Sequence, residues 1–307
     1  MRILVTGGAG YLGSVLVGKL LSEGHYVDVL DDFSWGVPSL AAHCANERLQ
    51  IHRGDVRDTR LLRAVLSDAD VIMPLAALVG APLCDTQSAA AWGVNVEAIE
   101  SLAHFAPTQP IIIPISNSGY GIGGDGECTE DSPLRPVSVY GQTKVEAERI
   151  IMNRGNAVSL RLATLFGISP RMRTDLLVND FVLRAVRDQA ITLFEAGFRR
   201  NFIHVRDAAC AFVHVLKNWD TMRGQIYNVG LSDANLTKLQ LCERIAAHTP
   251  FSWAEIAGKE DPDKRDYIVS NTKIEATGWS PKYSLDHGIL ELIKGYRMFK
   301  QHEHGNI

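Results

Sequence analysis

The sequence has few cysteines and no excess of positive charge. Its five cysteines are odd in number and form no Cys-x-x-Cys motif, which favours reduced thiols in a cytoplasmic protein over a disulfide framework. The 31 basic and 35 acidic residues give a formal net charge of −4, so the chain offers no overall basic field to nucleic acid. His302 and His304 resemble a pair of metal ligands, but they lie in a tail that we expect to be frayed, and we predict no metal site.

Long hydrophobic runs are also missing. No apolar stretch approaches the ~18 residues that a membrane-spanning helix needs, so we expect no membrane association. A glycine-rich turn follows almost directly after the first residue, from which we expect no signal peptide. A hydrophobic fraction of 46% and a charged fraction of 21% are ordinary for a globular protein. The length suits one large α/β domain or one and a half domains.

What the chain does have is this glycine-rich turn. An apolar run leads into the segment Val-Thr-Gly-Gly-Ala-Gly-Tyr-Leu-Gly of residues 5–13, and an amphipathic run follows over residues 15–21. The pattern predicts a strand, a turn of the G-x-G-x-x-G type and a helix. Such a turn lets a pyrophosphate approach the backbone at the N-terminus of the helix. The dinucleotide contacts predicted here are Gly7, Gly10, Tyr11 and Leu12.

Acidic residues follow the next two predicted strands. Asp31 ends an apolar run about 20 residues after the glycines, where a carboxylate accepts hydrogen bonds from a ribose 2′-hydroxyl and repels a 2′-phosphate. No Arg or Lys lies between Asp31 and His43, so NAD is favoured over NADP. Asp55 is placed either to reach the adenine or to cap the following helix, a role for which Asp58 competes. The contacts predicted here are Asp31, Asp32, Asp55 and Val56.

Strand and helix patterns alternate through the first half of the chain. Buried strands are predicted at 71–75, 111–115 and 157–162, with helices over about 89–105 and 138–154 between them. Pro114 is awkward inside a central strand, because it has no N–H to donate. The alternation predicts an α/β fold with a Rossmann-type, doubly wound parallel sheet.

From Gly167 the alternation loosens. Helices are predicted at about 176–188, 205–218, 237–248 and 284–301, with short strands at 191–194 and 226–229. This half carries no nucleotide-binding glycine turn of its own. We therefore predict an NAD-binding domain over 1–166 and a smaller α/β substrate-binding lobe over 167–307, with the chain crossing between them near the C-terminus.

A tyrosine and a lysine lie four residues apart on the predicted helix over 138–154. The spacing puts Tyr140 and Lys144 on one helix face, where a lysine cation lowers the pKa of a phenol and makes it a usable general base. Ser116, at the end of the preceding strand, is placed to donate a hydrogen bond to the same substrate oxygen. We predict that these three residues are catalytic. Small residues after the strand at 71–75 would let a ligand approach the backbone, namely Leu75, Ala76, Ala77 and Val79.

Several segments carry a resemblance to a known family. They are residues 7–13, 54–58 (Gly-Asp-Val-Arg-Asp), 75–77, 140–144 (Tyr-Gly-Gln-Thr-Lys), 161–167, 200–207 (Arg-Asn-Phe-Ile-His-Val-Arg-Asp) and 227–230. Together they resemble the extended short-chain dehydrogenase/reductases of the NAD-dependent nucleotide-sugar epimerase/dehydratase family, nearly end to end. The resemblance implies NAD as cofactor, a nucleotide-diphosphate sugar as substrate and a homodimer built on the helices over 89–105 and 138–154.

The resemblance also assigns roles to further residues. Asn95, which would otherwise be taken as a solvent-facing mid-helix Asn, supports the active site and the cofactor. The predicted substrate contacts are Val79, Asn117, Ser118, Asn179, Arg200 and Arg265. Arginines suit a diphosphate, but we expect at least two of Arg171, Arg173, Arg199, Arg200 and Arg206 to be ordinary surface residues.

Three departures from the family pattern bear on the chemistry. Pro74 stands where a His usually precedes Leu-Ala-Ala. Family dehydratases carry Asp-Glu after the catalytic Thr as acid and base for losing water, whereas this chain has Asn117 and Ser118, so elimination is disfavoured. The segment 260–265 replaces an Arg-Pro-Gly-Asp pattern, which leaves the diphosphate contact of Arg265 uncertain.

Narrower stretches resemble the GDP-heptose C4 dehydrogenases of bacterial capsule polysaccharide biosynthesis. They are residues 74–84, 117–123, 167–173 and 261–267. The resemblance implies oxidation of GDP-D-glycero-manno-heptose to its 4-keto form by tightly bound NAD, with NADH reoxidised by 2-oxoglutarate. The same three catalytic residues would also serve an NAD-dependent 4-epimerase that acts on a UDP- or GDP-sugar. This epimerase is the alternative to the C4 oxidation. A non-catalytic NAD-binding regulator is less favoured, because it would not need Ser116, Tyr140 and Lys144.

Overall fold

The computed structural model describes residues 1–256 and 265–298. The segment 261–264, which contributes to the narrower resemblance, lies outside these residues. So does the C-terminal tail with His302 and His304.

A seven-stranded parallel sheet, called the large sheet below, forms the centre of the molecule. Its strand order is β11-β7-β5-β4-β1-β2-β3. The strands are β1 (Arg2–Thr6), β2 (Tyr26–Asp31), β3 (Leu49–Arg53), β4 (Val71–Pro74), β5 (Ile111–Ser116), β7 (Ala157–Leu162) and β11 (Ile226–Val229). This confirms the predicted Rossmann-type α/β fold and the positions of the predicted strands.

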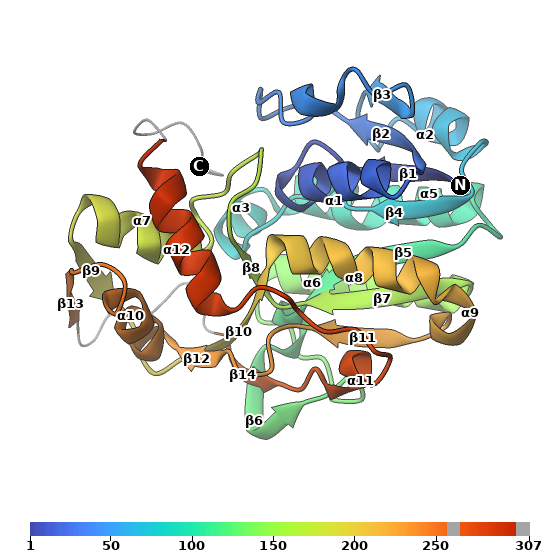
Figure 1. The fold of residues 1–307 in the computed structure, drawn as a ribbon. Helices are drawn as coiled ribbons and strands as arrows, with labels where there is room; N and C mark the ends of the chain where they lie inside the picture. The colour runs from blue at the N-terminus through green and yellow to red at the C-terminus, as the bar shows by residue number, and fades with distance from the viewer. Residues whose placement is uncertain (257–264, 299–307) are drawn as a thin grey trace.

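Helices cover both faces of the large sheet, because successive side chains of a buried strand point to opposite faces. In β1, Ile3 and Val5 belong to the hydrophobic cluster under α1 and α8, whereas Leu4 belongs to the cluster under α2, α5 and α6. Figure 1 shows α1 and α8 lying side by side over one face. These helices are α1 (Tyr11–Ser22), α2 (Thr59–Leu66), α5 (Ala98–Phe105), α6 (Val139–Arg154) and α8 (Val205–Lys217).

The second half of the chain contributes to both parts of the molecule. Its strand β11 is an edge strand of the large sheet and its helix α8 packs on α1. The chain thus returns to the large sheet after residue 166, and the boundary at that residue stays a prediction.

Three smaller sheets lie beside and below the large sheet in Figure 1. They pair β12-β10-β8, β13-β9 and β14-β6. Their strands are β6 (Ile122–Cys128), β8 (Thr164–Phe166), β9 (Ala190–Leu193), β10 (Arg199–His204), β12 (Asn235–Thr237), β13 (Ser252–Glu255) and β14 (Asp266–Val269). The helices around them are α7 (Leu177–Arg187), α9 (Trp219–Met222), α10 (Lys238–Ala246), α11 (Thr272–Glu275) and α12 (Leu285–Tyr296). Helix α12 ends before residue 301, to which its pattern predicted it would extend.

The predicted helix over 89–105 has an irregular middle. It consists of α4 (Ser88–Trp92), a π-helical turn η2 (Gly93–Glu97) and α5. The remaining short elements are η1 (Ala41–His43), α3 (Ala81–Thr86) and η3 (Asn117–Tyr120). A π-helical turn inside a longer helix is often found at a functional site, and this one carries Asn95.

Pro114 does lie in a central strand. It is opposite Leu160 of β7, while β5 pairs with β4 at Ile111, near its start. Pro114 also lines the cavity described below, so this ladder position lies at the ligand edge of the sheet.

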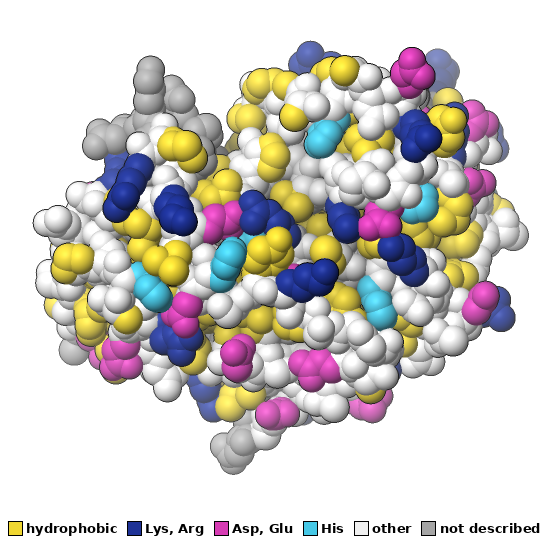
Figure 2. All heavy atoms as spheres, viewed as in Figure 1, with side chains coloured by type: hydrophobic (Ala, Val, Ile, Leu, Met, Phe, Trp, Pro, Cys, Tyr) yellow, Lys and Arg dark blue, Asp and Glu magenta, His cyan; other side chains and the backbone are white. Residues whose placement is uncertain are grey.

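The surface matches the balanced composition. On the face shown in Figure 2, Lys and Arg side chains are interspersed with Asp and Glu side chains. None of the helices in the described part of the chain has the length and apolar character needed to cross a membrane.

Candidate active site

A cavity of about 580 Å³ opens at the carboxyl ends of the large-sheet strands. In open α/β sheets this edge is where ligands bind. Both halves of the chain contribute to its walls. The main groups of lining residues are Gly7, 10–13, 30–32, 34–35, 54–57, 75–81, Leu83, 114–116, Tyr140, Lys144, 162–165, Arg171, Arg173 and Arg265.

The glycine-rich turn forms one end of the cavity and fits a dinucleotide. Gly7 has φ +68°, and a Cβ there would lie 2.5 Å from the backbone N of Ala76. A Cβ on Gly13 would lie 2.2 Å from the carbonyl oxygen of Gly7, so glycine is required for the turn to close on the helix. Helix α1 begins after Gly10 without a side-chain cap, which leaves backbone N–H groups and the positive end of the helix dipole for a diphosphate. Gly7, Gly10, Tyr11 and Leu12 all line this end.

The predicted acidic residues lie beside the turn. Asp31, at the end of β2, accepts hydrogen bonds from the backbone N–H groups of Ala9 (2.9 Å) and Phe33 (2.8 Å). Asp58 caps α2 by accepting from Arg60 and Leu61, which leaves Asp55 outside that role. Asp55 instead pairs with Arg57 and lines the cavity. Asp32 and Val56 line it as well.

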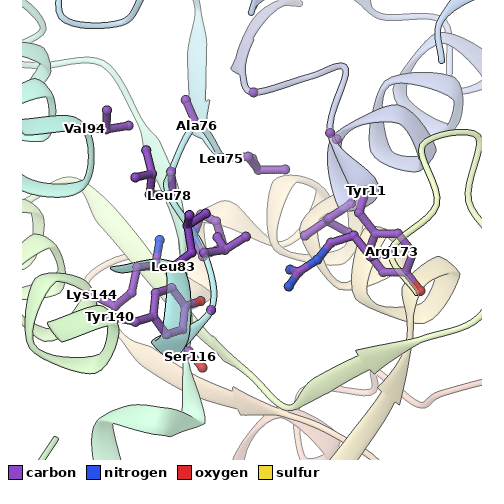
Figure 3. A pocket seen from close by; sticks show the side chains of 18 of the residues that line it. Tyr11, Leu75, Ala76, Leu78, Leu83, Val94, Ser116, Tyr140, Lys144 and Arg173 are labelled. Atoms are coloured by element: carbon purple, nitrogen blue, oxygen red, sulfur yellow. The ribbon is translucent and has the colours of Figure 1, made fainter. Parts of the chain in front are cut away.

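The opposite end of the cavity holds the predicted catalytic residues. Tyr140 and Lys144 project from the first turns of α6, whose N-cap Ser138 accepts from the backbone N–H of Gly141 at 3.2 Å. Ser116, at the end of β5, lies close enough to the Tyr140 hydroxyl to lower its pKa. Figure 3 shows the three side chains on one wall, with Tyr11 and Arg173 across from them.

A buried ion pair fixes α6 against the sheet. The Glu148 carboxylate on α6 accepts a hydrogen bond from the Arg161 guanidinium on β7 at 2.7 Å. The Glu148 side chain is 5% exposed and the Arg161 side chain is 4% exposed. Breaking such a pair would leave a buried charge without its partner, so it holds the helix in one position on the sheet. The distance between Ser116 on β5 and Tyr140 on α6 depends on that position.

Burial controls the protonation of the catalytic pair. It raises the pKa of the Tyr140 hydroxyl, while the nearby Arg173 and Arg265 cations and the Ser116 hydrogen bond oppose the rise. Burial also lowers the pKa of Lys144 to about 8. The helical spacing predicts that Lys144, together with an oxidised nicotinamide, lowers the pKa of Tyr140. The structure differs, since burial outweighs the opposing charges and the cations that act on Tyr140 are arginines.

Asn95 is a buried support and does not face solvent. Its side-chain oxygen accepts from the backbone N–H of Leu78 at 2.8 Å, and its amide donates to the Leu78 carbonyl and to the Thr143 hydroxyl, both at 3.0 Å. Asn95 thus joins the segment 75–80 to α6 next to Lys144. Leu75, Ala76, Ala77 and Val79 of that segment line the cavity.

The structure does not bring all predicted substrate contacts to the cavity. Val79 and Arg265 line it. Asn117 and Ser118 are buried in η3, and Arg200 is buried with its guanidinium donating to the Arg199 carbonyl at 2.9 Å. Asn179 accepts from the Gly167 N–H and donates to the Tyr11 hydroxyl and the Arg173 carbonyl. These four are not among the described residues that line the cavity, and their role as substrate contacts stays a prediction.

The arginines of the second half divide into two groups. Arg199 pairs with Asp266 and Arg206 with Glu291, in agreement with the expectation that some are ordinary surface residues. Arg171 and Arg173 line the cavity. Trp35 and Ser34 line it too and were not predicted, although their position directly after Asp31 and Asp32 was a usable signal.

Comparisons with known proteins agree with this site. The model of the NAD dependent epimerase/dehydratase family matches residues 3–230. The low-salt glycan biosynthesis protein Agl12 of Haloferax volcanii is 30% identical over 308 residues, covering 96% of this chain and 98% of Agl12. Human dTDP-D-glucose 4,6-dehydratase is 25% identical, covering 96% of this chain and 90% of that protein. The crystal structure of UDP-glucuronic acid 4-epimerase from Bacillus cereus with UDP-glucuronic acid and NAD superposes with a TM-score of 0.84 at 25% identity, covering 97% and 99% of the two chains.

Proposed function

Because the chain belongs to the NAD-dependent epimerase/dehydratase family, we propose that it converts a nucleotide sugar to its C4 epimer. When bound, NAD supplies the hydride acceptor. The residues proposed to hold it are Gly7, Gly10, Tyr11, Leu12, Asp31, Asp32, Asp55, Val56, Leu75, Ala76, Ala77 and Asn95, together with Tyr140 and Lys144. In this proposal the Tyr140 phenolate takes the proton of the C4 hydroxyl, and Ser116 hydrogen bonds to the same oxygen.

One observation carries the choice of epimerisation over dehydration. Loss of water from a 4-keto sugar needs an acid and a base near the sugar ring. The carboxylates among the described residues that line the cavity are Asp31, Asp32 and Asp55, all at the ends of β2 and β3 beside the glycine-rich turn. The residues near Tyr140 are instead Ser116, Lys144, the cations Arg173 and Arg265, and apolar or small side chains, with no carboxylate among the described lining residues there. The groups near Tyr140 therefore suit proton transfer at the C4 hydroxyl, but they do not supply a carboxylic acid and base for the elimination of water.

A second candidate is oxidation without return of the hydride. It would convert GDP-D-glycero-manno-heptose to its 4-keto form and pass the hydride on to 2-oxoglutarate. Its support is that three of the stretches that resemble GDP-heptose C4 dehydrogenases reach the cavity, through most of residues 75–83, through Arg171 and Arg173, and through Arg265. The UDP-glucuronic acid 4-epimerase and its structural match favour the first candidate. The intact catalytic set argues against a regulator that only binds NAD.

The two candidates and dehydration give different products in one experiment. The NAD-loaded enzyme is incubated in D2O with UDP-glucose, UDP-glucuronic acid or GDP-heptose, with and without 2-oxoglutarate, and products are separated by chromatography before mass spectrometry. Epimerisation gives a new peak of unchanged mass without deuterium and without need of 2-oxoglutarate. Oxidation gives a product lighter by two hydrogen atoms that accumulates only with 2-oxoglutarate. A product that has lost water and gained deuterium would contradict both candidates.

The proposed substrate contacts are Val79, Asn117, Ser118, Asn179, Arg200 and Arg265. Of these, Val79 and Arg265 have the support of lining the cavity. We also keep the division into an NAD-binding domain over 1–166 and a sugar-nucleotide-binding lobe over 167–307 as a proposal. Limited proteolysis with and without nucleotide sugar would test it, since cleavage within 167–307 should be the more strongly suppressed by the sugar.

We propose a homodimer as the working form. The helices expected to build it, α4 with α5 and α6, pack on one another on one face of the large sheet. Trp92, on α4, is 38% exposed and gives this surface a large apolar side chain. Light scattering coupled to gel filtration would test this, and replacement of Trp92 by Glu should shift a dimer toward monomer.

A further inference from the structure

Two loops meet across the cofactor end of the cavity. Trp35 lies on the loop after β2, and Arg171 lies on the loop between β8 and α7. The guanidinium carbon of Arg171 lies 4.1 Å from the centre of the Trp35 ring, well within the ~6 Å of a cation–π contact. Both residues line the same cavity as Gly7 and Gly10. The contact therefore joins the two halves of the chain beside the glycine-rich turn.

The loop that carries Arg171 is fastened to helix α1. The Tyr11 hydroxyl donates to the Gly167 carbonyl at 2.6 Å, and the Ser169 hydroxyl donates to the Tyr11 carbonyl at 2.7 Å. Ser169 also exchanges a hydrogen bond with Ser14 at 3.1 Å. Arg171 is thus held by the first turn of the helix whose N-terminus faces the cavity.

The loop that carries Trp35 is fastened to the glycine-rich turn. Asp31 accepts from the Ala9 N–H, and the Ser39 hydroxyl donates to the Ala9 carbonyl at 2.7 Å. Between them, Phe33 takes φ 55° and Gly36 φ 64°, and the Gly36 N–H donates to the Phe33 carbonyl at 3.0 Å. Positive φ is costly for a phenylalanine, so this turn is imposed by its surroundings. It presents the indole ring toward Arg171.

Arg171 and Trp35 differ in how far they are exposed to solvent, and Arg171 carries a charge. Arg171 is 4% exposed and Trp35 is 45% exposed, so the indole lies between the guanidinium and solvent. Burial lowers the pKa of Arg171 to about 10, and the carboxylates of Asp175 and Asp31 only partly offset this. A diphosphate brought into the cavity would favour the charged form and would gain a planar donor suited to phosphate oxygens.

We propose that Trp35 and Arg171 form a clasp that retains NAD in this chain through successive turnovers. In the clasp, Arg171 supplies positive charge to the dinucleotide and Trp35 keeps that charge out of water. Release of the dinucleotide requires the two loops to separate. The clasp deepens the proposed function, because an enzyme that returns the hydride to the same sugar gains from a cofactor that never leaves.

Exchange of bound NAD in the resting enzyme tests the clasp. Protein loaded with isotope-labelled NAD is mixed with excess unlabelled NAD, without any sugar, and the label that remains bound is followed over time. We expect Trp35→Ala and Arg171→Met each to release the label about tenfold faster or more, the size of a desolvated cation–π contact. Trp35→Phe keeps an aromatic face and should stay close to the wild type. The double variant should be no faster than the faster single variant, because both remove one interaction.

The chain offers a matched control in Tyr26. It is 49% exposed and has the guanidinium carbons of Arg2 and Arg48 at 5.6 and 5.8 Å from its ring, but it does not line the cavity. Tyr26→Ala should leave the exchange rate unchanged. If Trp35→Ala lowers the thermal stability of the cofactor-free protein, Trp35→Leu replaces it, since leucine keeps apolar volume without a π face.

Two results would overturn the clasp. One is wild-type exchange in Trp35→Ala or in Arg171→Met. The other is a double variant whose acceleration equals the product of the two single accelerations. Neither result depends on which sugar reaction the enzyme performs. The NAD exchange rates would therefore still test the clasp if the epimerase assay failed.

Discussion

At the scale of single residues, the Tyr140 hydroxyl is the group on which the proposed chemistry depends. Tyr140→Phe removes the proton acceptor and little volume, so the fold should persist while turnover falls by ~10²-fold or more. Steady-state rates with the best nucleotide sugar measure the loss, and circular dichroism checks the fold. Tyr26→Phe, an exposed tyrosine outside the cavity, should keep full activity. Near-normal turnover in Tyr140→Phe would exclude the phenolate as the base.

The protonation of Tyr140 gives a second prediction. The base works only when deprotonated, so activity should rise with pH through the pKa of this hydroxyl. Burial raises that pKa, and the Arg173 cation is the first of the groups that oppose the rise. Arg173→Met should therefore move the rising limb of kcat/KM to higher pH. Arg184→Met removes an exposed arginine that pairs with Asp180, and it should leave the limb in place. If the rising limb of kcat/KM also stays at the same pH in Arg173→Met, the Arg173 cation does not influence the pKa of Tyr140.

Single residues also show what could be read from the sequence. Tyr140 and Lys144 could be paired because helical spacing is local, and Asp31 could be placed because a parallel strand ends at the ligand edge. Arg171 could not be placed, because its position depends on bonds from Ser169 and Gly167 to Tyr11, which lies far away in sequence. The pKa balance of Tyr140 was misjudged for the same reason, since it depends on burial and on two distant arginines.

At the scale of elements, the π-helical turn η2 places Asn95 against the segment 75–80. Asn95→Ala would leave the N–H of Leu78 without its acceptor and Thr143 without a donor, while the Leu78 carbonyl would keep the Cys84 thiol as its donor. Buried groups left in this way cost about 1–3 kcal/mol. We expect that loss in the free energy of unfolding by urea, together with weaker NAD binding. Asn46→Ala, in an exposed turn, is the control. An unchanged unfolding free energy in Asn95→Ala would mean that this support is not needed.

The elements differ in how far they could be predicted. The large-sheet strands were evident because buried parallel strands are continuous apolar runs. The π-helical turn was not evident, since the same residues fit a regular helix, and the contacts that Asn95 makes there are with the distant Leu78 and Thr143. The segment of edge strand β11 could be predicted to be a strand. Its pairing with β7 could not, because the chain comes back to the large sheet through contacts between residues far apart in sequence.

At the scale of the whole molecule, the cavity is walled by both halves of the chain. Residues 7–57 form one side, and residues 162–173 with Arg265 form another. A dinucleotide in this cavity would contact segments that are also joined by the bonds of Tyr11 and Ser169, by the contact of Trp35 with Arg171 and by a shared hydrophobic cluster. Ligand binding should thus stabilise the fold as a unit and not one half alone.

Thermal unfolding with two dinucleotides tests this and the role of Asp31 together. At about a hundredfold excess over Kd, a ligand adds about 2.7 kcal/mol of stability, which for a chain of this size corresponds to roughly 4 °C in Tm. NAD should produce that shift in a single cooperative transition. NADP at the same concentration should produce a smaller shift, because the Asp31 carboxylate repels a 2′-phosphate. In Asp31→Asn the difference between the Tm shifts produced by NAD and NADP should become smaller. The protein should also lose some stability, because the Asp31 side chain accepts hydrogen bonds from the N–H groups of Ala9 and Phe33. Equal shifts by both dinucleotides in the wild type would show that Asp31 does not select the cofactor.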